Sequence, residues 1–377
     1  MREYCPMAKI ITPIYPLRTF FSLTILLLLN ACSDFGYYWH TSTGHIALMN
    51  QRVYIDNILE DPDLDPKFRE RLLLVKAIRV FSVETLALPK SGSYNNYVQL
   101  DRAYALQNLF AAAEFSTDLY LWCYPIVGCA GYRGYYDEEL LASYVQQLKA
   151  QNYDTYVANV PAYSTLGWFD DPVLSSFIYW PDYRLAGLLF HELSHQRIYI
   201  KNDTQFNESL AVAVQQAGTE LWLKTSQHGQ QLEEYRRWIE YQGEVITLIK
   251  ETRETLAELY RSDDDEVSMR EQKQLILAGS RDNYAALALR LNYRDGFANW
   301  FAGNLNNARL GSVSAYHAQT PAFLAILKAQ KYDFEAFFKT VESISKLDKS
   351  ARDGCLALWF EGRILVGEGC PKAPAQS

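Results

Sequence analysis

The residues best suited to chemistry lie near the middle of the chain, in the segment HELSHQ that begins at His191. Residues four apart on a helix share one face about one turn from each other, so His191 and His195 would point the same way. Two imidazoles in this arrangement can bind one Zn²⁺, and Glu192 beside the first can reach a water on an open coordination position. The segment predicts a zinc site in which Glu192 is the general base.

An exposed helix with two ordinary histidines is the alternative interpretation of this segment. The chain has only 6 histidines, so a chance match to His-Glu-x-x-His is rare. The preceding residues 182–190 (DYRLAGLLF) are strongly apolar, which is the setting of a buried active-site helix. We therefore expect one bound zinc ion.

A catalytic zinc needs a third protein ligand, and Glu208 is the leading candidate. It stands thirteen residues after His195, near the start of a second predicted helix. A short reversal between the two helices would bring its carboxylate back over the histidines and leave the fourth coordination position for water. Glu220 is the competing acid. A histidine as the third ligand has no candidate in this region, because no histidine occurs between His195 and His228. The alternative for Glu208 is an acid favoured by the helix dipole.

The two metal segments, HELSHQ and NESLA, resemble the zinc-binding arrangement of aminopeptidase N-type gluzincins, with a shorter connection. From Cys32 to about Leu347, the chain is also similar to a family of predicted aminopeptidases that occur as lipoproteins in proteobacteria. The other segments that carry this likeness are YYWHTSTGHIALM (37–49), YPIVGCAGYRGYY (124–136), VPAYSTLGWFDDPVLSSF (160–177) and NNARLGSVSAYHAQTPAF (306–323).

The resemblance implies a gluzincin-like fold, zinc-dependent hydrolysis of peptide bonds, and Glu208 as a ligand at the head of a helix. It also implies that the extended segment 163–171 pairs with the substrate backbone as an edge strand. The chain departs from the thermolysin-like pattern at one position. That pattern has an Asp four residues after the ligand Glu, where it orients a ligand histidine, whereas this chain has Val212. Another residue must therefore orient the histidine.

Four residues are candidates for contact with a peptide substrate. An exopeptidase must recognise a cationic α-amine, for which the carboxylates of Asp170 and Asp171 are the nearest partners, although Asp-Pro can also simply mark a turn. The oxyanion of peptide hydrolysis needs a hydrogen-bond donor, and Tyr316 and His317 in the family-like C-terminal segment are the candidates. Three further tyrosines compete for this role: Tyr260, Tyr284 and Tyr293.

An apolar front end precedes the catalytic part. Residues 20–29 form an apolar run that is too short to span a bilayer, which takes about 20 residues, but has the length of a signal-peptide core. Ala31 and Cys32 follow, an arrangement similar to a bacterial lipobox in which Cys32 becomes the lipidated first residue. An ordinary secretion signal or an N-terminal anchor is the alternative. We expect a lipid-anchored protein of the bacterial cell envelope that faces the periplasm, at the outer rather than the inner membrane.

Four cysteines remain after lipidation, in a compartment where they can oxidise. They allow three connectivities, of which the simplest pairs Cys123 with Cys129 and Cys355 with Cys370. A zinc site is the alternative, but spacings of six and fifteen residues match no zinc-knuckle pattern. Disulfides are therefore expected.

Helical patterns dominate the rest of the chain. The expected fold class is α+β and mostly α, with a zincin-like (gluzincin-like) catalytic core, a small β-sheet and an additional helical C-terminal part. Residues 1–31 would be the signal peptide and 32–377 one domain, with the metal-binding core at about 120–225 and the helical part at 229–377. Helices are predicted over 63–88, 100–115, 137–151, 182–199, 207–223, 231–260 and 266–291, with two more within 322–347, and strands within 120–136 and 153–160.

Composition narrows the classes of function. Hydrophobic residues make up 49% and charged residues 21% of the chain, which suits a folded globular protein. The formal charge is −8 without a basic run, so no nucleic acid is expected as a partner, because phosphate contacts need clustered Lys and Arg. The leading hypothesis is a membrane-anchored zinc aminopeptidase that acts on peptides. A zinc endopeptidase and a non-catalytic envelope scaffold are the alternatives.

Overall fold

A computed structural model of the chain describes residues 36–124, 128–162, 165, 167–225, 229–293, 296–314, 319–362 and 370. The predicted lipidation site Cys32 and the apolar run 20–29 lie outside the described residues, as do Tyr316 and His317. Contacts divide the chain into two units, residues 1–48 and 49–377. Residues 36–48 of the first unit are helical, and the labelled helices and strands belong to the second.

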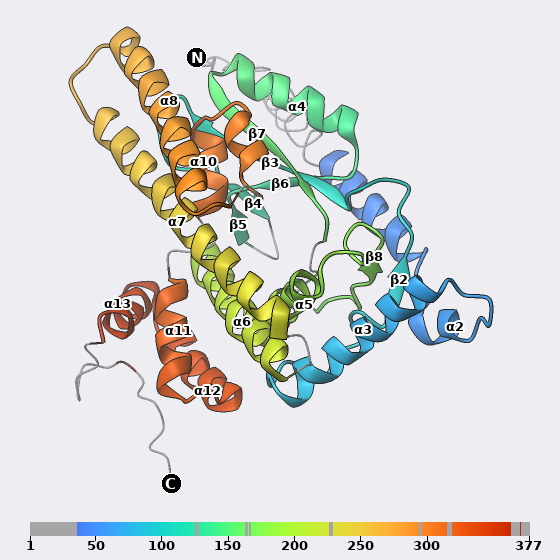
Figure 1. Cartoon of the computed structure of the whole chain (residues 1–377). Coiled ribbons are helices and arrows are strands. Elements are labelled where there is room, and N and C mark those ends of the chain that lie inside the picture. Colours follow the sequence, from blue (N-terminus) through green and yellow to red (C-terminus); the bar gives the residue numbers. More distant parts are fainter. Residues whose placement is uncertain are drawn as a thin grey trace, which may run out of the picture. The chain divides into compact units, whose positions relative to one another are not determined.

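Helices make up most of the second unit, and several short strands lie in its first half (Figure 1). The mostly helical α+β class expected from the sequence is thus confirmed. Among the described residues, no helix combines the length and the apolar character that crossing a membrane requires. The elements are β1 (Val53–Tyr54), α2 (Ile55–Leu59), α3 (Pro66–Glu84), β2 (Asn96–Val98), β3 (Leu106–Ala113), β4 (Trp122–Tyr124), β5 (Gly128–Ala130), β6 (Arg133–Tyr135), α4 (Glu138–Ala150), β7 (Tyr153–Val160), β8 (Val173–Leu174), α5 (Asp182–Arg197), α6 (Thr204–Thr225), α7 (Gly229–Leu259), α8 (Glu266–Arg290), α9 (Ala298–Ala302), α10 (Asn307–Ser314), α11 (Thr320–Ala329), α12 (Phe334–Ser345) and α13 (Lys349–Phe360).

Aspartate caps set the start of several helices. The carboxylate of an N-cap residue accepts a hydrogen bond from a backbone N–H of the first turn, which has no partner within the helix. Pro66, directly after one of these caps, adds a fixed φ that favours the first helical position. The capping residues are Asp65, Asp137, Asp265, Asp333 and Asp348.

The central strand β3 pairs antiparallel with β6 on one side and with β7 on the other. Its pairing with β7 runs over eight positions, from Leu106 opposite Val160 to Ala113 opposite Tyr153. In a second sheet, β2 pairs antiparallel with β1 and parallel with β8. A separate two-stranded ribbon joins β4 to β5. The strands predicted within 120–136 and 153–160 are confirmed.

The helix predicted over 100–115 is wrong, because this segment contains β3. Four consecutive residues of the strand, 109–112, are buried. Helix α10 packs on β3 and places Ala308 against Phe110, and α4 also packs on β3 and β7. A strand buried on both faces has a continuous apolar run instead of an alternating one. Leu and Ala in that run are also strong helix formers, so spacing and propensity both suggested the wrong element.

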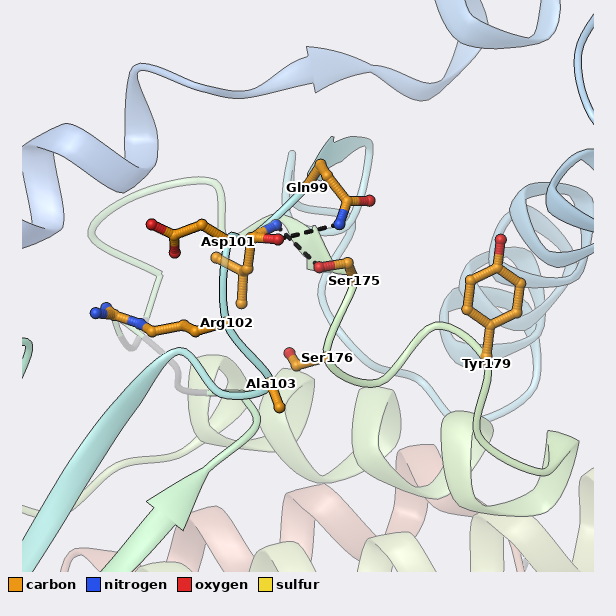
Figure 2. A pocket seen from close by; sticks show the side chains of 8 residues that line it. Gln99, Asp101, Arg102, Ala103, Ser175, Ser176 and Tyr179 are labelled. Carbon is orange, nitrogen blue, oxygen red and sulfur yellow. Dashed lines mark hydrogen bonds between the residues drawn. The ribbon is translucent and has the colours of Figure 1, made fainter.

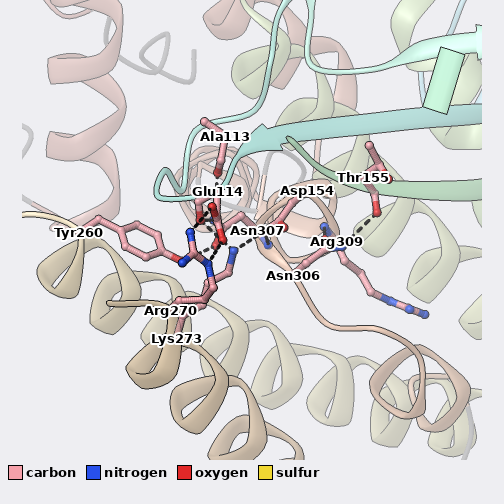
Figure 3. Close-up of polar contacts among 10 residues, drawn as sticks. All are labelled: Ala113, Glu114, Asp154, Thr155, Tyr260, Arg270, Lys273, Asn306, Asn307 and Arg309. Carbon is pink, nitrogen blue, oxygen red and sulfur yellow. Dashed lines mark hydrogen bonds and ion pairs between the residues drawn. The ribbon is translucent and has the colours of Figure 1, made fainter. Parts of the chain in front are cut away.

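The polar cluster in Figure 3 attaches the sheet to the helical C-terminal part. Lys273 of α8 is buried, and its ammonium donates to the Asp154 carboxylate of β7 at 2.7 Å and to the Glu114 carbonyl at 2.8 Å. Asn307 donates to the Asp154 carboxylate from its backbone N–H and to the Ala113 carbonyl from its side chain. Paired in this way, the buried Lys273 charge joins the ends of β3 and β7 to α8 and α10.

Buried tyrosines predict a fall in stability at high pH. Burial raises the pKa of Tyr97 and of Tyr183 to about 12, and it also raises the pKa of Tyr235, Tyr241 and Tyr260. Because an unfolded tyrosine titrates near pH 10, the stability these groups supply is complete below pH 10 and is lost as pH rises toward 12. Urea midpoints should therefore be similar at pH 8 and pH 9 and fall clearly between pH 10 and pH 11.

Absorbance at 295 nm provides the control for this prediction. The buried tyrosines should ionise together with unfolding, as a cooperative step, after the exposed tyrosines have titrated. A smooth titration of all tyrosines near pH 10 in a protein that stays folded would contradict the expected burial effect.

Candidate metal centre

Helices α5 and α6 bring the three predicted metal ligands together. The Glu208 carboxylate oxygen lies 3.3 Å from Nε2 of His191 and 3.8 Å from Nε2 of His195. One donor atom from each residue falls within 4.8 Å of the others. Figure 1 shows the two helices side by side near the middle of the unit. The competing acid Glu220 instead pairs with Lys224 and Arg236 at the surface.

These distances match the geometry of a zinc site. Zn–N and Zn–O bonds of about 2.1 Å at tetrahedral angles place neighbouring donor atoms about 3.4 Å apart. The observed separations of 3.3 and 3.8 Å bracket this value. Two imidazoles and one carboxylate are also the donor set of catalytic zinc sites that keep a fourth position for water or substrate. The three residues therefore fit zinc.

The connection between α5 and α6 places Glu208 by a side-chain clasp. The Asn207 side chain accepts a hydrogen bond from the Ile200 N–H and donates one to the Ile200 carbonyl, each at 2.8 Å. The Asp203 carboxylate accepts from the Phe206 N–H at the start of α6. These contacts close the reversal predicted from the sequence and fix the backbone beside Glu208.

Gln215 orients His191. Its side-chain carbonyl lies 3.1 Å from Nδ1 of the imidazole, and a carbonyl oxygen can only accept, so Nδ1 carries a hydrogen and Nε2 is the ring atom that faces Glu208. Gly187 allows the close helix contact that brings Gln215 there, since a Cβ at Gly187 would lie only 3.2 Å from Cγ of Gln215. Gln215 supplies the support that Val212 cannot. No motif in the sequence indicated Gln215, although Glu208 and Gln215, seven residues apart, share one helix face.

The electrostatics of the cluster keep one histidine neutral. Burial lowers the pKa of His195 to about 4, which leaves its ring free to act as a ligand at neutral pH. Burial opposes protonation of His191 as well, but the hydrogen bond to Glu208 and the nearby carboxylates outweigh it and raise the pKa of His191. Burial raises the pKa of Glu192 to about 7; the charge of His191 opposes this shift, and the Glu208 and Asp171 carboxylates add to it.

The two candidate substrate carboxylates differ in position. Asp171 is buried and lies near enough to Glu192 for its charge to act on that residue. Its carboxylate accepts a hydrogen bond from the Thr165 N–H at 2.9 Å. Asp170 is exposed, and its backbone carbonyl accepts from the Arg52 guanidinium. Of the two, Asp171 is therefore the one whose charge acts on Glu192.

A serine braces Asp171 against α5. The Ser93 hydroxyl oxygen accepts hydrogen bonds from the Asp171 N–H and from the Gln196 side-chain amide. The Arg79 guanidinium in turn donates to the Ser93 carbonyl. Gln196 is one helical turn after Glu192, so this contact fixes the Asp171 backbone relative to the predicted general base. None of these three bracing residues was identified from the sequence.

The described part of the segment 163–171 does not form the edge strand that the resemblance implied. Its described residues, 165 and 167–171, contain a turn in which the Trp168 N–H donates to the Thr165 carbonyl. The strand β8 begins only at Val173 and pairs with β2.

Both cysteine pairs expected as the simplest connectivity are present as disulfides. Cys123 and Cys129 face each other across the β4–β5 ribbon. Asn202, in the connection between α5 and α6, accepts a hydrogen bond from the Cys129 N–H, so the ribbon contacts the segment that leads to Glu208. The second disulfide joins Cys355 of α13 to Cys370.

Two of the competing tyrosines serve the packing of the helical part. The Tyr260 hydroxyl donates to the Asn307 side chain in the cluster of Figure 3. The Tyr284 hydroxyl is hydrogen-bonded to that of Tyr241, and its ring stacks on Phe301. These contacts account for the hydroxyl groups of Tyr260 and Tyr284 without a role in catalysis.

A surface pocket lies apart from the ligand cluster. Figure 2 shows it between the segment of Gln99 and Arg102 and the residues that follow β8, with the Leu100 N–H donating to the Ser175 hydroxyl. Ser175 follows β8, whereas Asp171 precedes it, so the pocket is at the other end of this strand. The Arg102 guanidinium already donates to three backbone carbonyls. None of the residues that line this pocket belongs to α5 or α6.

The fold and the cluster together define a mostly helical protein with a partly buried His₂Glu cluster on two adjacent helices. The chain belongs to the family described as "Putative aminopeptidase", whose model matches residues 36–356. This membership supports peptidase activity in general and implies a peptide substrate. Comparison with curated proteins and with solved structures gave no match.

Proposed function

We propose that the protein is a zinc-dependent aminopeptidase with a gluzincin-like catalytic core. The observation that carries the proposal is the convergence of His191, His195 and Glu208 within 4.8 Å, in a chain of a peptidase family. Glu192, adjacent to one ligand, is the general base. The cofactor is one Zn²⁺ ion.

The chain's own groups account for proton transfer and for ligand geometry. Zinc in this site would polarise the scissile carbonyl and make a water acidic near neutral pH. Glu192 takes the proton of the attacking water and delivers it to the leaving amine. Gln215 keeps Nε2 of His191 directed at the metal position, and Asn207 holds the backbone beside Glu208. Both contacts reduce the reorganisation that metal binding requires.

Recognition of the substrate N-terminus is assigned to Asp171. A buried carboxylate whose charge acts on the general base would pair with a cationic α-amine and place the first peptide bond at Glu192. Asp170, which is exposed, is the weaker candidate. An endopeptidase does not recognise a free N-terminus and would not need this pairing. A structural zinc site would need a fourth protein ligand.

Zinc content and peptide hydrolysis test the proposal together. The mature protein should bind one zinc per chain and hydrolyse peptides with a free N-terminus, and an acetyl group on that N-terminus should abolish cleavage because it removes the charge that Asp171 recognises. Cleavage of free and acetylated peptides at equal rates would support the endopeptidase instead. Bound zinc without hydrolysis of either peptide would support the scaffold and contradict the proposal.

The cell envelope is the proposed location of this activity. Cys32 would carry the lipid, and the protein would face the periplasm from the membrane surface, with the outer membrane favoured. Disulfides at Cys123–Cys129 and Cys355–Cys370 suit an oxidising compartment. Replacement of Cys32 by Ser should release the protein from the membrane fraction, and retention there would contradict lipidation.

A further inference from the structure

Tyr199 lies beside the metal ligands in a position that no sequence motif indicated. It follows Ile198, whose extended backbone ends α5. Its ring is edge-on to the His195 imidazole, with the ring centroids 6.4 Å apart. The side chain is 40% exposed, so one part of the ring packs on a ligand while another part reaches solvent. Within the described part of the chain, its hydroxyl makes no hydrogen bond.

The backbone on both sides of Tyr199 is held in place. On one side, the Ile198 N–H donates to the Ser194 carbonyl at 3.2 Å. On the other, the Asn207 side chain bonds both backbone groups of Ile200. Because Asn207 immediately precedes Glu208, one clasp positions both the phenol and the third ligand. A hydrogen bond to a reacting atom costs less conformational entropy when its donor is already held in position.

Two other amide side chains near the ligands already make hydrogen bonds. The Gln196 amide donates to Ser93, and Gln215 presents its carbonyl to His191. The phenol of Tyr199 combines an available O–H, partial exposure and contact with a ligand ring. Peptide-bond hydrolysis creates an oxyanion that is stabilised by a donor about 2.7–3.1 Å away.

On the basis of the proposed function, we propose that Tyr199 is a catalytic residue whose hydroxyl donates a hydrogen bond to the oxyanion formed from the scissile carbonyl. No covalent bond to the tyrosine forms. The phenol remains neutral throughout, and its hydrogen bond strengthens as negative charge develops on the substrate oxygen.

The variant Tyr199→Phe isolates this hydrogen bond, because it keeps the ring against His195 and removes only the hydroxyl. We expect kcat to fall by about 10²–10³-fold with little change in KM, as for loss of one oxyanion donor. Zinc content should stay at the wild-type level. The affinity for a phosphinic peptide that mimics the tetrahedral state should fall with kcat, whereas the affinity for an uncleaved substrate-like peptide should not. Tyr179→Phe, at the separate surface pocket, is the matched control and should behave as wild type.

Four outcomes would overturn the role of Tyr199. An unchanged kcat in Tyr199→Phe would do so, as would equal loss of affinity for the phosphinic and the substrate-like peptide. A loss confined to Tyr316→Phe or His317→Ala would assign the donor to the residues expected from the sequence. If the wild type binds zinc but cleaves no peptide, the proposed function fails and the role of Tyr199 fails with it. An active wild type with an unaffected Phe variant overturns the role of Tyr199 alone.

Discussion

Replacement of Glu192 by Gln should lower kcat for a peptide with a free N-terminus by roughly 10²–10⁴-fold while the zinc content is retained. Gln has nearly the same size as Glu but cannot accept the proton of the attacking water. Glu192 is not one of the three residues whose donor atoms converge, so the metal should stay bound. Steady-state kinetics and zinc measured per chain check both parts.

Glu220→Gln is the matched control for this substitution. Glu220 is on α6, like the proposed ligand Glu208, but it pairs with Lys224 and Arg236 at the surface. Its amide variant should therefore keep wild-type kinetics, because exposed ion pairs contribute little. If Glu192→Gln retained the wild-type kcat, Glu192 would not be the base. If it lost the zinc, the lost activity would reflect the metal site and not proton transfer.

The part of the site that could be predicted from the sequence is the part set by local spacing. His191 and His195 are four residues apart on one helix, so their shared face follows from helix geometry alone. Glu208 could be added because a short connection limits where the next helix can run. The structure brings these three together, and no long-range information was needed to propose them.

Interactions between distant segments could not be predicted from the sequence. Ser93 and Gln196 are 103 residues apart, and nothing in either segment signals that they meet at Asp171. The error at β3 has the same origin, since burial by α4 and α10 on its two faces removed the alternation that identifies a strand. Tyr199 was missed for a related reason. The Asn207 clasp on Ile200, which fixes the backbone after this ring, has no signal in the sequence.

We expect the second large effect when a buried ion pair is broken, and this effect is on stability. Arg352 of α13 donates to the Asp203 carboxylate from Nε at 3.1 Å and from Nη2 at 2.5 Å, and both residues are buried. Arg352→Ala would leave the Asp203 charge buried without its main partner, which costs about 3–5 kcal/mol of unfolding free energy. Urea unfolding followed by circular dichroism measures this loss.

Lys349→Ala is the matched control, because Lys349 also faces Asp203, at 3.6 Å, but from an exposed position. Its removal should cost at most about 1 kcal/mol, and equal costs for the two variants would contradict a buried pair as the source of the stability. The double variant Arg352→Ala with Asp203→Ala should lose less than the sum of the two single losses, since it removes the unpaired charge.

Asp203 also caps the helix that carries Glu208. Arg352→Ala should therefore weaken zinc binding in a chelator competition, whereas Lys349→Ala should not, and this difference would show that a C-terminal helix supports the metal site from a distance.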